Sequence, residues 1–284
     1  MSPQLVTDAP LAHLAWHPAV AAASGPSGAS LAVLLHGVGG GRGGWASTGA
    51  ALAAQGFHVL AVDQPGYGLS APIEPYDLAG LADAVGRLIV HAGGGAAASA
   101  LVVGHSMGGM VAQELVARTP ARVRALVLAA TSPAFGPADG DWQAGFLRAR
   151  FAPLDAGLGM AGLAAELVPA MRGRGVAPEA WMPAACALMA AVPEATYRRA
   201  LAALVPFDRR EALARIAVPT LVVTGEDDRT ASPEVARRMA ARIPAAELAV
   251  VPATGHLLML EQPAAFDRVL LDFVARRVAA APKE

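Results

Sequence analysis

Short apolar runs alternate with helical stretches from the start of the chain to residue 129. Apolar runs of strand length lie at 11–16, 31–36, 58–63, 100–103 and 123–129. Apolar side chains at helical spacing occupy the stretches between the later runs, at 52–55, 78–91 and 109–118. Strands that alternate with helices predict a parallel sheet covered by helices on both faces.

The alternation stops near residue 131, and the next stretch has a different character. Residues 134–213 contain no strong strand, and prolines recur among several helix-like segments. The earlier pattern then returns as two strand-like runs and a closing helix, at 220–224, 247–251 and 263–277. We therefore expect an α/β fold in which 1–133 and 214–284 form the core domain and 134–213 is an inserted helical cap.

Large apolar and aromatic side chains are concentrated in the predicted cap. Over a buried site, such side chains form an adaptable apolar wall, and short helices bounded by prolines can shift. We expect four of them to contact substrate: Trp142, Trp181, Met182 and Tyr197. The alternative is that the segment consists of ordinary interior helices that pack against the sheet.

Composition narrows the class of protein. Hydrophobic residues make up 55% of the 284 residues and charged residues 16%, which excludes a disordered protein. The formal net charge of −1 gives no electrostatic basis for binding nucleic acid or an anionic membrane. Arginine greatly outnumbers lysine, of which Lys283 is the only one, and this bias is typical of GC-rich bacterial genomes.

Cysteine usage and the N-terminal sequence indicate the compartment. Cys186 is the only cysteine, so the chain cannot form an internal disulfide or a thiolate metal cluster, and we expect a cytoplasmic protein. The first 41 residues contain no lysine or arginine, which argues against the charged start of a signal peptide. The uncharged stretch 92–113 is rich in glycine, which favours a buried strand and turn over a membrane span.

One five-residue turn carries the strongest chemical signal. Gly104-His105-Ser106-Met107-Gly108 lies between an apolar strand and a helical stretch. A Gly-x-Ser-x-Gly turn in that context is a nucleophile elbow, which raises a serine hydroxyl above the sheet. Small residues at both ends let the strand and the helix pass close together. We expect Ser106 to be a catalytic nucleophile, and a chance match in a glycine-rich chain is the alternative.

The chain also supplies a base and an acid for Ser106. A serine hydroxyl needs a general base within hydrogen-bond reach, and the base needs an orienting acid. Where a nucleophile elbow is present, the order along the chain is serine, then acid, then histidine. We expect His256, in a loop after a late strand, to be the base. We expect Asp228, at the end of a Gly-Glu-Asp-Asp turn, to be the acid; Asp227 and Glu226 are the alternatives.

The other six histidines have structural interpretations. Three of them are expected at the surface: His13, His17 and His91. His58 begins a predicted strand, and His36 and His105 lie beside turns where a ring can brace the backbone. None of these six follows a late strand, which is the position that the catalytic order requires.

Acyl transfer also needs hydrogen-bond donors for a developing oxyanion. The residue after the nucleophile supplies one backbone N–H, which here belongs to Met107. The second is expected from the glycine-rich loop 36–40 after an early strand, and Val38 is our candidate. Turn geometry alone is the alternative explanation for the glycines of this loop.

A second pattern points to a different class of enzyme. Gly39, Gly41 and Gly44 form a Gly-x-Gly-x-x-Gly sequence after a strand, and Asp63 ends the next strand about 20 residues later, as in a dinucleotide-binding fingerprint. An NAD-dependent oxidoreductase is therefore an alternative. This alternative is weakened because the glycines begin late after the strand and because it gives Ser106 no role.

Over residues 31–277 the chain resembles the α/β-hydrolase superfamily. Five motifs carry the resemblance, in order: His36-Gly37, Asp63-Gln-Pro-Gly-Tyr-Gly-Leu-Ser70, Gly104-His-Ser-Met-Gly-Gly109, Gly225-x-x-Asp228 and Gly255-His256. The resemblance implies a mostly parallel eight-stranded sheet, a triad of Ser106, Asp228 and His256, and no metal or organic cofactor. An aspartate nucleophile would indicate a dehalogenase or epoxide hydrolase, and serine at this position argues against both.

Two segments, 106–113 and 188–197, resemble 3-oxoadipate enol-lactonases, although the same elbow recurs in esterases and cofactor-free haloperoxidases. We expect a serine hydrolase that cleaves a small carboxylic ester or lactone through an acyl-enzyme on Ser106. The alternatives are a C–C bond hydrolase, a cofactor-free haloperoxidase or perhydrolase, and a non-enzymatic binding module of the same fold. An anionic substrate would require a positive clamp, for which the cap offers Arg148, Arg150, Arg172, Arg174, Arg198 and Arg199.

Overall fold

A single sheet organises the computed structural model, which describes residues 2–18, 30–136, 140–244 and 246–278. Its strands are Gln4–Val6 (β1), His13–Trp16 (β2), Ser30–Leu35 (β3), Phe57–Val62 (β4), Ala100–His105 (β5), Val123–Ala129 (β6), Thr220–Gly225 (β7) and Ala246–Val251 (β8). Their spatial order is β1-β2-β4-β3-β5-β6-β7-β8. The pairs β1/β2 and β2/β4 are antiparallel and all other neighbours are parallel, which confirms the mostly parallel eight-stranded sheet.

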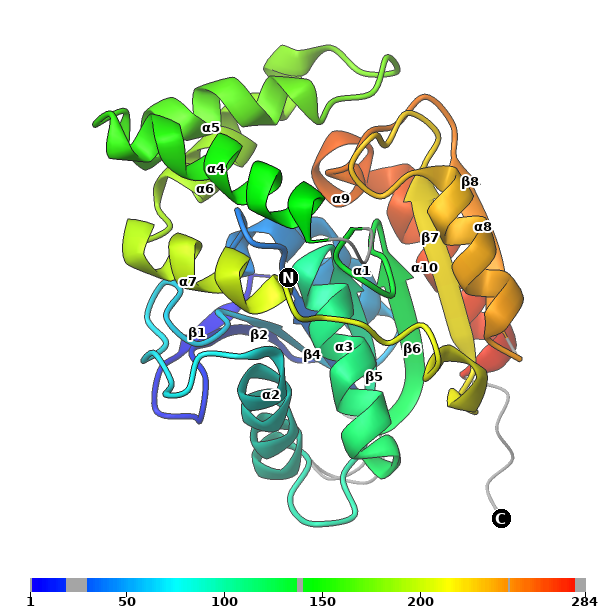
Figure 1. Ribbon diagram of the computed structural model, residues 1–284. Helices are drawn as coiled ribbons and strands as arrows, with labels where there is room; N and C mark the ends of the chain where they lie inside the picture. Colours follow the sequence, from blue (N-terminus) through cyan, green and yellow to red (C-terminus); the bar gives the residue numbers. More distant parts are fainter. Residues whose placement is uncertain (1, 19–29, 137–139, 245, 279–284) are drawn as a thin grey trace.

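Helices cover both faces of this sheet (Figure 1). One face is covered by α2 (Leu78–Ala92), α3 (Met107–Arg118) and α8 (Pro233–Arg242), and the other by α1 (Ala46–Ala54) and α10 (Pro263–Arg277). All residues of β5 and β7 are buried, which explains why these strands are continuous apolar runs in the sequence. Of the helices that the structure describes, none is long and apolar enough to cross a membrane.

Four further α-helices lie between β6 and β7, over the carboxyl ends of the strands (Figure 1). They are α4 (Asp141–Asp155), α5 (Gly159–Ala170), α6 (Met182–Ala190) and α7 (Glu194–Leu204). We call residues 134–213 the helical insert; its residues 137–139 lie outside the described part. The two ends of the insert meet, because Phe135 N–H donates to Phe207 O at 3.1 Å and Arg209 N–H to Pro133 O at 2.7 Å. The function of the insert as a cap stays a prediction.

Three local features differ from the sequence-based expectations. The edge strand β1 was not anticipated, because its three exposed or half-exposed residues are too few to show a pattern. The helix α8 was not anticipated either, because only Ala236 and Met239 of its ten residues are buried and three of the other eight are arginines. The expectation that His13 lies at the surface is wrong: its ring is buried in β2 and hydrogen-bonds to Leu11 O at 2.8 Å.

Candidate active site

Ser106 occupies a strained turn between β5 and α3. Its backbone has φ 52° and ψ −117°, in a region that a residue with a side chain rarely adopts. Glycine is required on both sides, because a Cβ at Gly104 would overlap the carbonyl of Gly108, and one at Gly108 would overlap the carbonyl of Leu35. The turn is held on the sheet because Ser106 N–H donates to Ala129 O at 2.9 Å. This geometry is that of a nucleophile elbow.

His256 lies within hydrogen-bond distance of both Ser106 and Asp228. The Nε2 atom of His256 is 3.1 Å from Ser106 Oγ, and Nδ1 is 2.9 Å from Asp228 Oδ2. The histidine follows β8 and the aspartate follows β7, so adjacent parallel strands bring together residues 28 positions apart. The chain of contacts from Ser106 through His256 to Asp228 has the arrangement in which a base activates a serine and an acid orients the base.

Asp228 is anchored by the backbone of its own turn. Its Oδ1 accepts hydrogen bonds from Thr230 N–H at 2.7 Å and Ala231 N–H at 2.9 Å, which leaves Oδ2 for His256. Burial opposes ionisation of this carboxyl, but the charge and hydrogen bond of His256 and the two N–H donors hold its pKa below the ordinary value. Asp228 is therefore a carboxylate at neutral pH that can stabilise an imidazolium.

The two alternatives for the acid contact another residue. Asp227 accepts from Arg174 N–H at 2.9 Å and pairs with the Arg174 guanidinium. Glu226 pairs with the same guanidinium at 2.6 Å and accepts from Ala253 N–H at 2.9 Å. Neither carboxylate contacts His256 in the described structure, so the geometry favours Asp228.

Two buried histidines brace the backbone around the site. His105 Nε2 hydrogen-bonds to His256 O at 2.9 Å, and burial lowers the pKa of His105 to about 3. His36 Nδ1 donates to Gly37 O at 2.8 Å while its Nε2 accepts from Gln64 N–H at 3.1 Å, and burial lowers the pKa of His36 to about 4. Both rings are neutral at physiological pH, and they fix the loops that carry Val38 and His256.

The two predicted oxyanion donors face the same cavity as Ser106. Met107 is the first residue of α3, where a backbone N–H has no acceptor within the helix. Val38 lies in the loop after β3, and a Cβ on neighbouring Gly37 would lie 3.1 Å from Ser106 Cβ, so this loop passes close to the serine. The Tyr67 hydroxyl donates to Val38 O at 3.0 Å and so holds the loop at this residue.

Asp63, the acid of the possible dinucleotide fingerprint, is bonded to Arg42 of the glycine-rich loop. Asp63 is buried and accepts hydrogen bonds from Arg42 N–H at 3.2 Å and Leu69 N–H at 3.1 Å. It also pairs with the guanidinium of Arg42. A ribose-binding acid needs its carboxylate free, so this arrangement argues against the dinucleotide-binding alternative.

A cavity of about 1040 Å³ opens above Ser106 and His256. Two of the four expected substrate contacts, Trp142 and Tyr197, line it. The other two do not: Trp181 is 4% exposed and packs in the core, and Met182 packs against that core. Cavity-lining residues of the insert outside those four include Phe146, Leu167, Leu188 and Met189. In the part of the chain that the structure describes, no group of three or more His, Cys, Asp and Glu side chains is placed to hold a metal ion.

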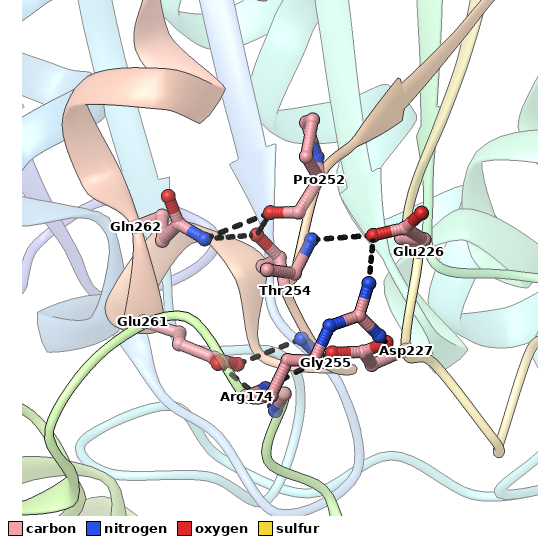
Figure 2. Close-up of polar contacts among 10 residues, drawn as sticks. Arg174, Glu226, Asp227, Pro252, Thr254, Gly255, Glu261 and Gln262 are labelled. Carbon is pink, nitrogen blue, oxygen red and sulfur yellow. Dashed lines mark hydrogen bonds and ion pairs between the residues drawn. The ribbon is translucent and has the colours of Figure 1, made fainter.

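One segment of the insert, residues 171–175, is hydrogen-bonded directly to the loop of the histidine. The buried carboxylate of Glu261 accepts from Gly173 N–H at 2.9 Å and from Gly255 N–H at 2.8 Å, so one side chain joins the two segments (Figure 2). The backbone N–H of His256 donates to Met171 O at 2.8 Å. Burial raises the pKa of Glu261 above its ordinary value.

Arg174 extends this junction to the loop of the acid. Its guanidinium contacts both Glu226 and Asp227, while Gln262 donates to Pro252 O at 3.0 Å (Figure 2). Sequence reasoning missed Glu261, because it is a polar residue at the end of an apolar stretch with no motif of its own. The contact of Glu261 with Gly173 spans 88 residues, so no local pattern predicts it.

Comparison with known proteins agrees with this geometry. Residues 32–269 match the family described as the Alpha/beta hydrolase family. A pimeloyl-[acyl-carrier protein] methyl ester esterase from Nitrosospira multiformis is 33% identical over 258 residues, which cover 82% of this chain and 90% of the relative.

Solved structures share the fold. A hydrolase from Pseudomonas aeruginosa PA01 has a TM-score of 0.79 and 28% identity, with 96% of this chain and 98% of that chain covered. The enol-lactonase from Burkholderia xenovorans LB400 has a TM-score of 0.71 and 24% identity, with 96% and 100% covered, and supports the fold alone. The matches and the site geometry lead to one conclusion: this chain belongs to the alpha/beta hydrolase family and is a hydrolase.

Proposed function

We propose that this hydrolase cleaves small carboxylic esters or lactones through an acyl-enzyme on Ser106. The observation that carries the proposal is the hydrogen-bonded chain from Ser106 Oγ through His256 to Asp228, which opens into the cavity described above. A relative named as a methyl ester esterase, 33% identical, supports an ester as the substrate.

Acylation begins when Ser106 Oγ attacks the carbonyl carbon of the ester. His256 Nε2 takes the hydroxyl proton, and Asp228 stabilises the resulting imidazolium. The N–H groups of Met107 and Val38 donate to the oxyanion of the tetrahedral intermediate. When the intermediate collapses, the ester C–O bond breaks and His256 gives its proton to the leaving alkoxide. In a lactone the alcohol remains attached to the acyl chain.

Deacylation reverses these roles with water as the nucleophile. His256 accepts a proton from water while the water oxygen attacks the acyl carbonyl. The same two backbone donors stabilise the second oxyanion. Collapse of this intermediate breaks the bond to Ser106 Oγ, which recovers its proton from His256, and releases the carboxylic acid.

The helical insert forms the specificity side of this site in the proposal. Trp142 and Tyr197 line the cavity together with aliphatic and sulfur-containing side chains, which suits an apolar acyl or alcohol group. Gly39 of the sheet domain lies against Met189 of the insert, because a Cβ added at Gly39 would be 3.2 Å from Met189 Sδ. The two parts of the chain therefore close the cavity together. A cytoplasmic location stays a prediction based on composition.

A covalent probe tests the proposal most directly. A fluorophosphonate should label the protein, and peptide mass spectrometry should locate the label on Ser106. Turnover of a panel of esters and lactones should then be lost in Ser106→Ala. Labelling at another residue, or unchanged turnover by the variant, contradicts the proposed nucleophile. Absence of turnover on every ester and lactone contradicts the substrate class.

A further inference from the structure

Two arginines of the helical insert, Arg150 and Arg210, line the active-site cavity, and Arg150 is the one without a carboxylate partner. Of the six insert arginines that could bind an anionic substrate, Arg150 lines the cavity that contains Ser106. Arg150 is on α4, and its guanidinium carbon lies 4.5 Å from the ring centroid of Phe146, which lines the same cavity. Stacking on an aromatic face leaves the N–H groups at the edge of the guanidinium available for hydrogen bonds.

Three of the other five candidate arginines differ from Arg150 because each is paired with a carboxylate: Arg174, Arg198 and Arg199. Arg198 pairs with Asp155 at 2.7 Å, and Arg174 pairs with Glu226 at 2.6 Å. In the described parts of the chain, Arg150 has no carboxylate within ion-pair distance, although it is only partly exposed. A partly buried cation without a counterion loses hydration and gains no ion pair in return, so a bound anion would stabilise it.

A buried phenol lies near Arg150. Tyr197 of α7 is 1% exposed and lines the same cavity, and its hydroxyl has no hydrogen-bond partner among the described residues. Burial raises the pKa of Tyr197 to about 12, against the opposing effect of the Arg150 charge, so the phenol is a neutral donor at physiological pH. The hydroxyl oxygen is not fully enclosed by protein, and Tyr197 lines the cavity, so a ligand in the cavity can accept its hydrogen bond.

Four other arginines also line the cavity. Three of them are paired with carboxylates of their own: Arg210, Arg238 and Arg242. Arg229 is exposed, so solvent and salt screen its charge. Among the arginines that line the cavity, Arg150 is therefore the one that is partly buried and has no carboxylate partner. It also lies near the Tyr197 hydroxyl, which can donate a hydrogen bond to the same ligand.

We propose that Arg150 and Tyr197 bind a negatively charged oxygen group, a carboxylate or a phosphate, at the far end of the ester substrate. This inference rests on the proposed function, since it assumes that the scissile ester lies at Ser106. The guanidinium supplies charge-assisted hydrogen bonds, and the phenol supplies one more. The enzyme then prefers esters with a second, anionic end over neutral esters of equal length.

Three methyl esters of equal chain length test the proposal: one ends in a carboxylate, one in a phosphate and one in a methyl group. In Arg150→Gln, kcat/KM for the preferred anionic ester should fall about 10- to 100-fold, mainly through KM, while the neutral ester changes less than about twofold. Tyr197→Phe should lower the same value by about fivefold. Arg148→Gln is the matched control, since Arg148 is an exposed arginine of the same helix outside the cavity.

The outcomes separate this inference from the proposed function. The anionic ester whose kcat/KM falls more in Arg150→Gln identifies the anionic group that the site recognises. An equal loss on the neutral and both anionic esters, or no loss on any of them, overturns the inference. If the wild type hydrolyses none of the three, the panel of esters and lactones decides the proposed function, and calorimetry decides the anion site alone. In that case, the free diacid and the phosphate-bearing acid should bind Ser106→Ala, and one of them should bind at least tenfold more weakly when Arg150→Gln is added. Unchanged binding overturns the inference.

Discussion

The loops at the carboxyl ends of the strands and the helical insert form facing walls of one cavity, but different forces hold them. On the sheet side, hydrogen bonds fix each reacting group: Asp228 accepts two N–H bonds, and the backbone of His256 is held by His105 and Met171. On the insert side, side chains such as Phe146 and Met189 are held by apolar packing. The first wall sets positions, and the second sets shape.

This difference separates chemistry from specificity. Hydrogen bonds are directional, so a group held by several of them keeps its position when its neighbours change. Apolar packing is not directional, and an insert wall built from it can be reshaped with small effects on the serine and histidine. The two walls are hydrogen-bonded to each other at the 171–175 segment, where Glu261 makes its contacts.

The largest expected effect is the loss of the nucleophile on the sheet side. Ser106→Ala should lower kcat by about 10⁴- to 10⁶-fold. In the described structure, no other hydroxyl is hydrogen-bonded to His256, so no second nucleophile can take the place of Ser106. The fold should be retained, which circular dichroism and the melting temperature check. A variant that unfolds, or that keeps more than about a tenth of the activity, contradicts the separation of chemistry from packing.

The acid gives the second largest effect and tests the turn residue by residue. Asp228→Asn should lower kcat about 10³- to 10⁴-fold, because an amide favours the wrong tautomer of His256. Asp227→Asn removes one partner of the exposed Arg174, so it should change kcat less than about threefold. Steady-state kinetics of both variants decide between the two aspartates, and a larger loss at Asp227 means that the structural assignment of the acid is wrong.

Acid should lower the free energy of unfolding through groups on the sheet side, because all seven histidines lie outside the insert. His36 and His105 stay neutral in the folded state down to pKa values of about 4 and about 3, whereas in the unfolded chain they protonate near pH 6.5. The unfolded state therefore binds more protons below pH 6.5. Their contribution to stability is complete above that pH and is lost as the pH falls, by about 2 kcal/mol per histidine at pH 5.

Urea unfolding at pH 7 and at pH 5 measures this loss. His105→Gln should reduce the difference between the two pH values, since glutamine does not titrate. The exposed His91 provides the control, and His91→Gln should leave the pH dependence of the wild type in place. A free energy of unfolding that is equal at the two pH values contradicts the prediction.

The contrast between the walls also explains what the sequence could predict. Ser106, Asp228 and His256 follow strand ends within short motifs, and the parallel sheet brings strand ends together whatever the helices do. The same order of strands and helices predicts the sheet, and the closing helix α10 has the bounds that the pattern indicates.

Insert positions were harder to predict, because three of the four helices there, α4, α5 and α6, lack a clean apolar stripe. Trp142 and Trp181 are both tryptophans near helix starts, yet one lines the cavity and the other lies in the core. Whether a residue of the insert faces the cavity or the core depends on how α4 and α6 pack. The contact of Glu261 with Gly173 also depends on how the insert packs on the sheet domain. These are properties of tertiary packing, which spacing along the chain does not encode.

The junction between the two walls should give an intermediate effect. In Glu261→Gln an amide NH₂ replaces one of two acceptor oxygens, so the N–H of Gly173 or Gly255 loses its partner. We expect a loss of about 1–3 kcal/mol in the free energy of unfolding and a lower kcat, because His256 follows Gly255 directly. Urea unfolding and kinetics measure the two effects.

Glu247 supplies the control for this junction. It pairs with Arg276 at 2.8 Å near the surface, so Glu247→Gln should cost less than about 1 kcal/mol and leave kcat unchanged. If Glu261→Gln behaves like Glu247→Gln, the junction does not hold the histidine loop.

The smallest effects should come from the apolar wall, and two tryptophans of the insert form a matched pair for measuring them. Trp142 is 43% exposed, stacks on Phe146 and lines the cavity, so Trp142→Ala should cost about 1 kcal/mol of stability or less. It should change the ratio of kcat/KM values for long and short acyl esters about three- to tenfold, because it removes apolar contact with the substrate.

Trp181→Ala should behave in the opposite way. Trp181 is buried outside the cavity lining, so its removal leaves a core void that costs about 3–5 kcal/mol, while the ranking of esters stays the same. Thermal unfolding and an ester series from acetate to decanoate measure both variants. If Trp142→Ala leaves the ranking unchanged, the insert is scaffold rather than a specificity wall. Selectivity must then come from the sheet side, where the loop around Val38 and Gly39 is the remaining part of the cavity that can set substrate length.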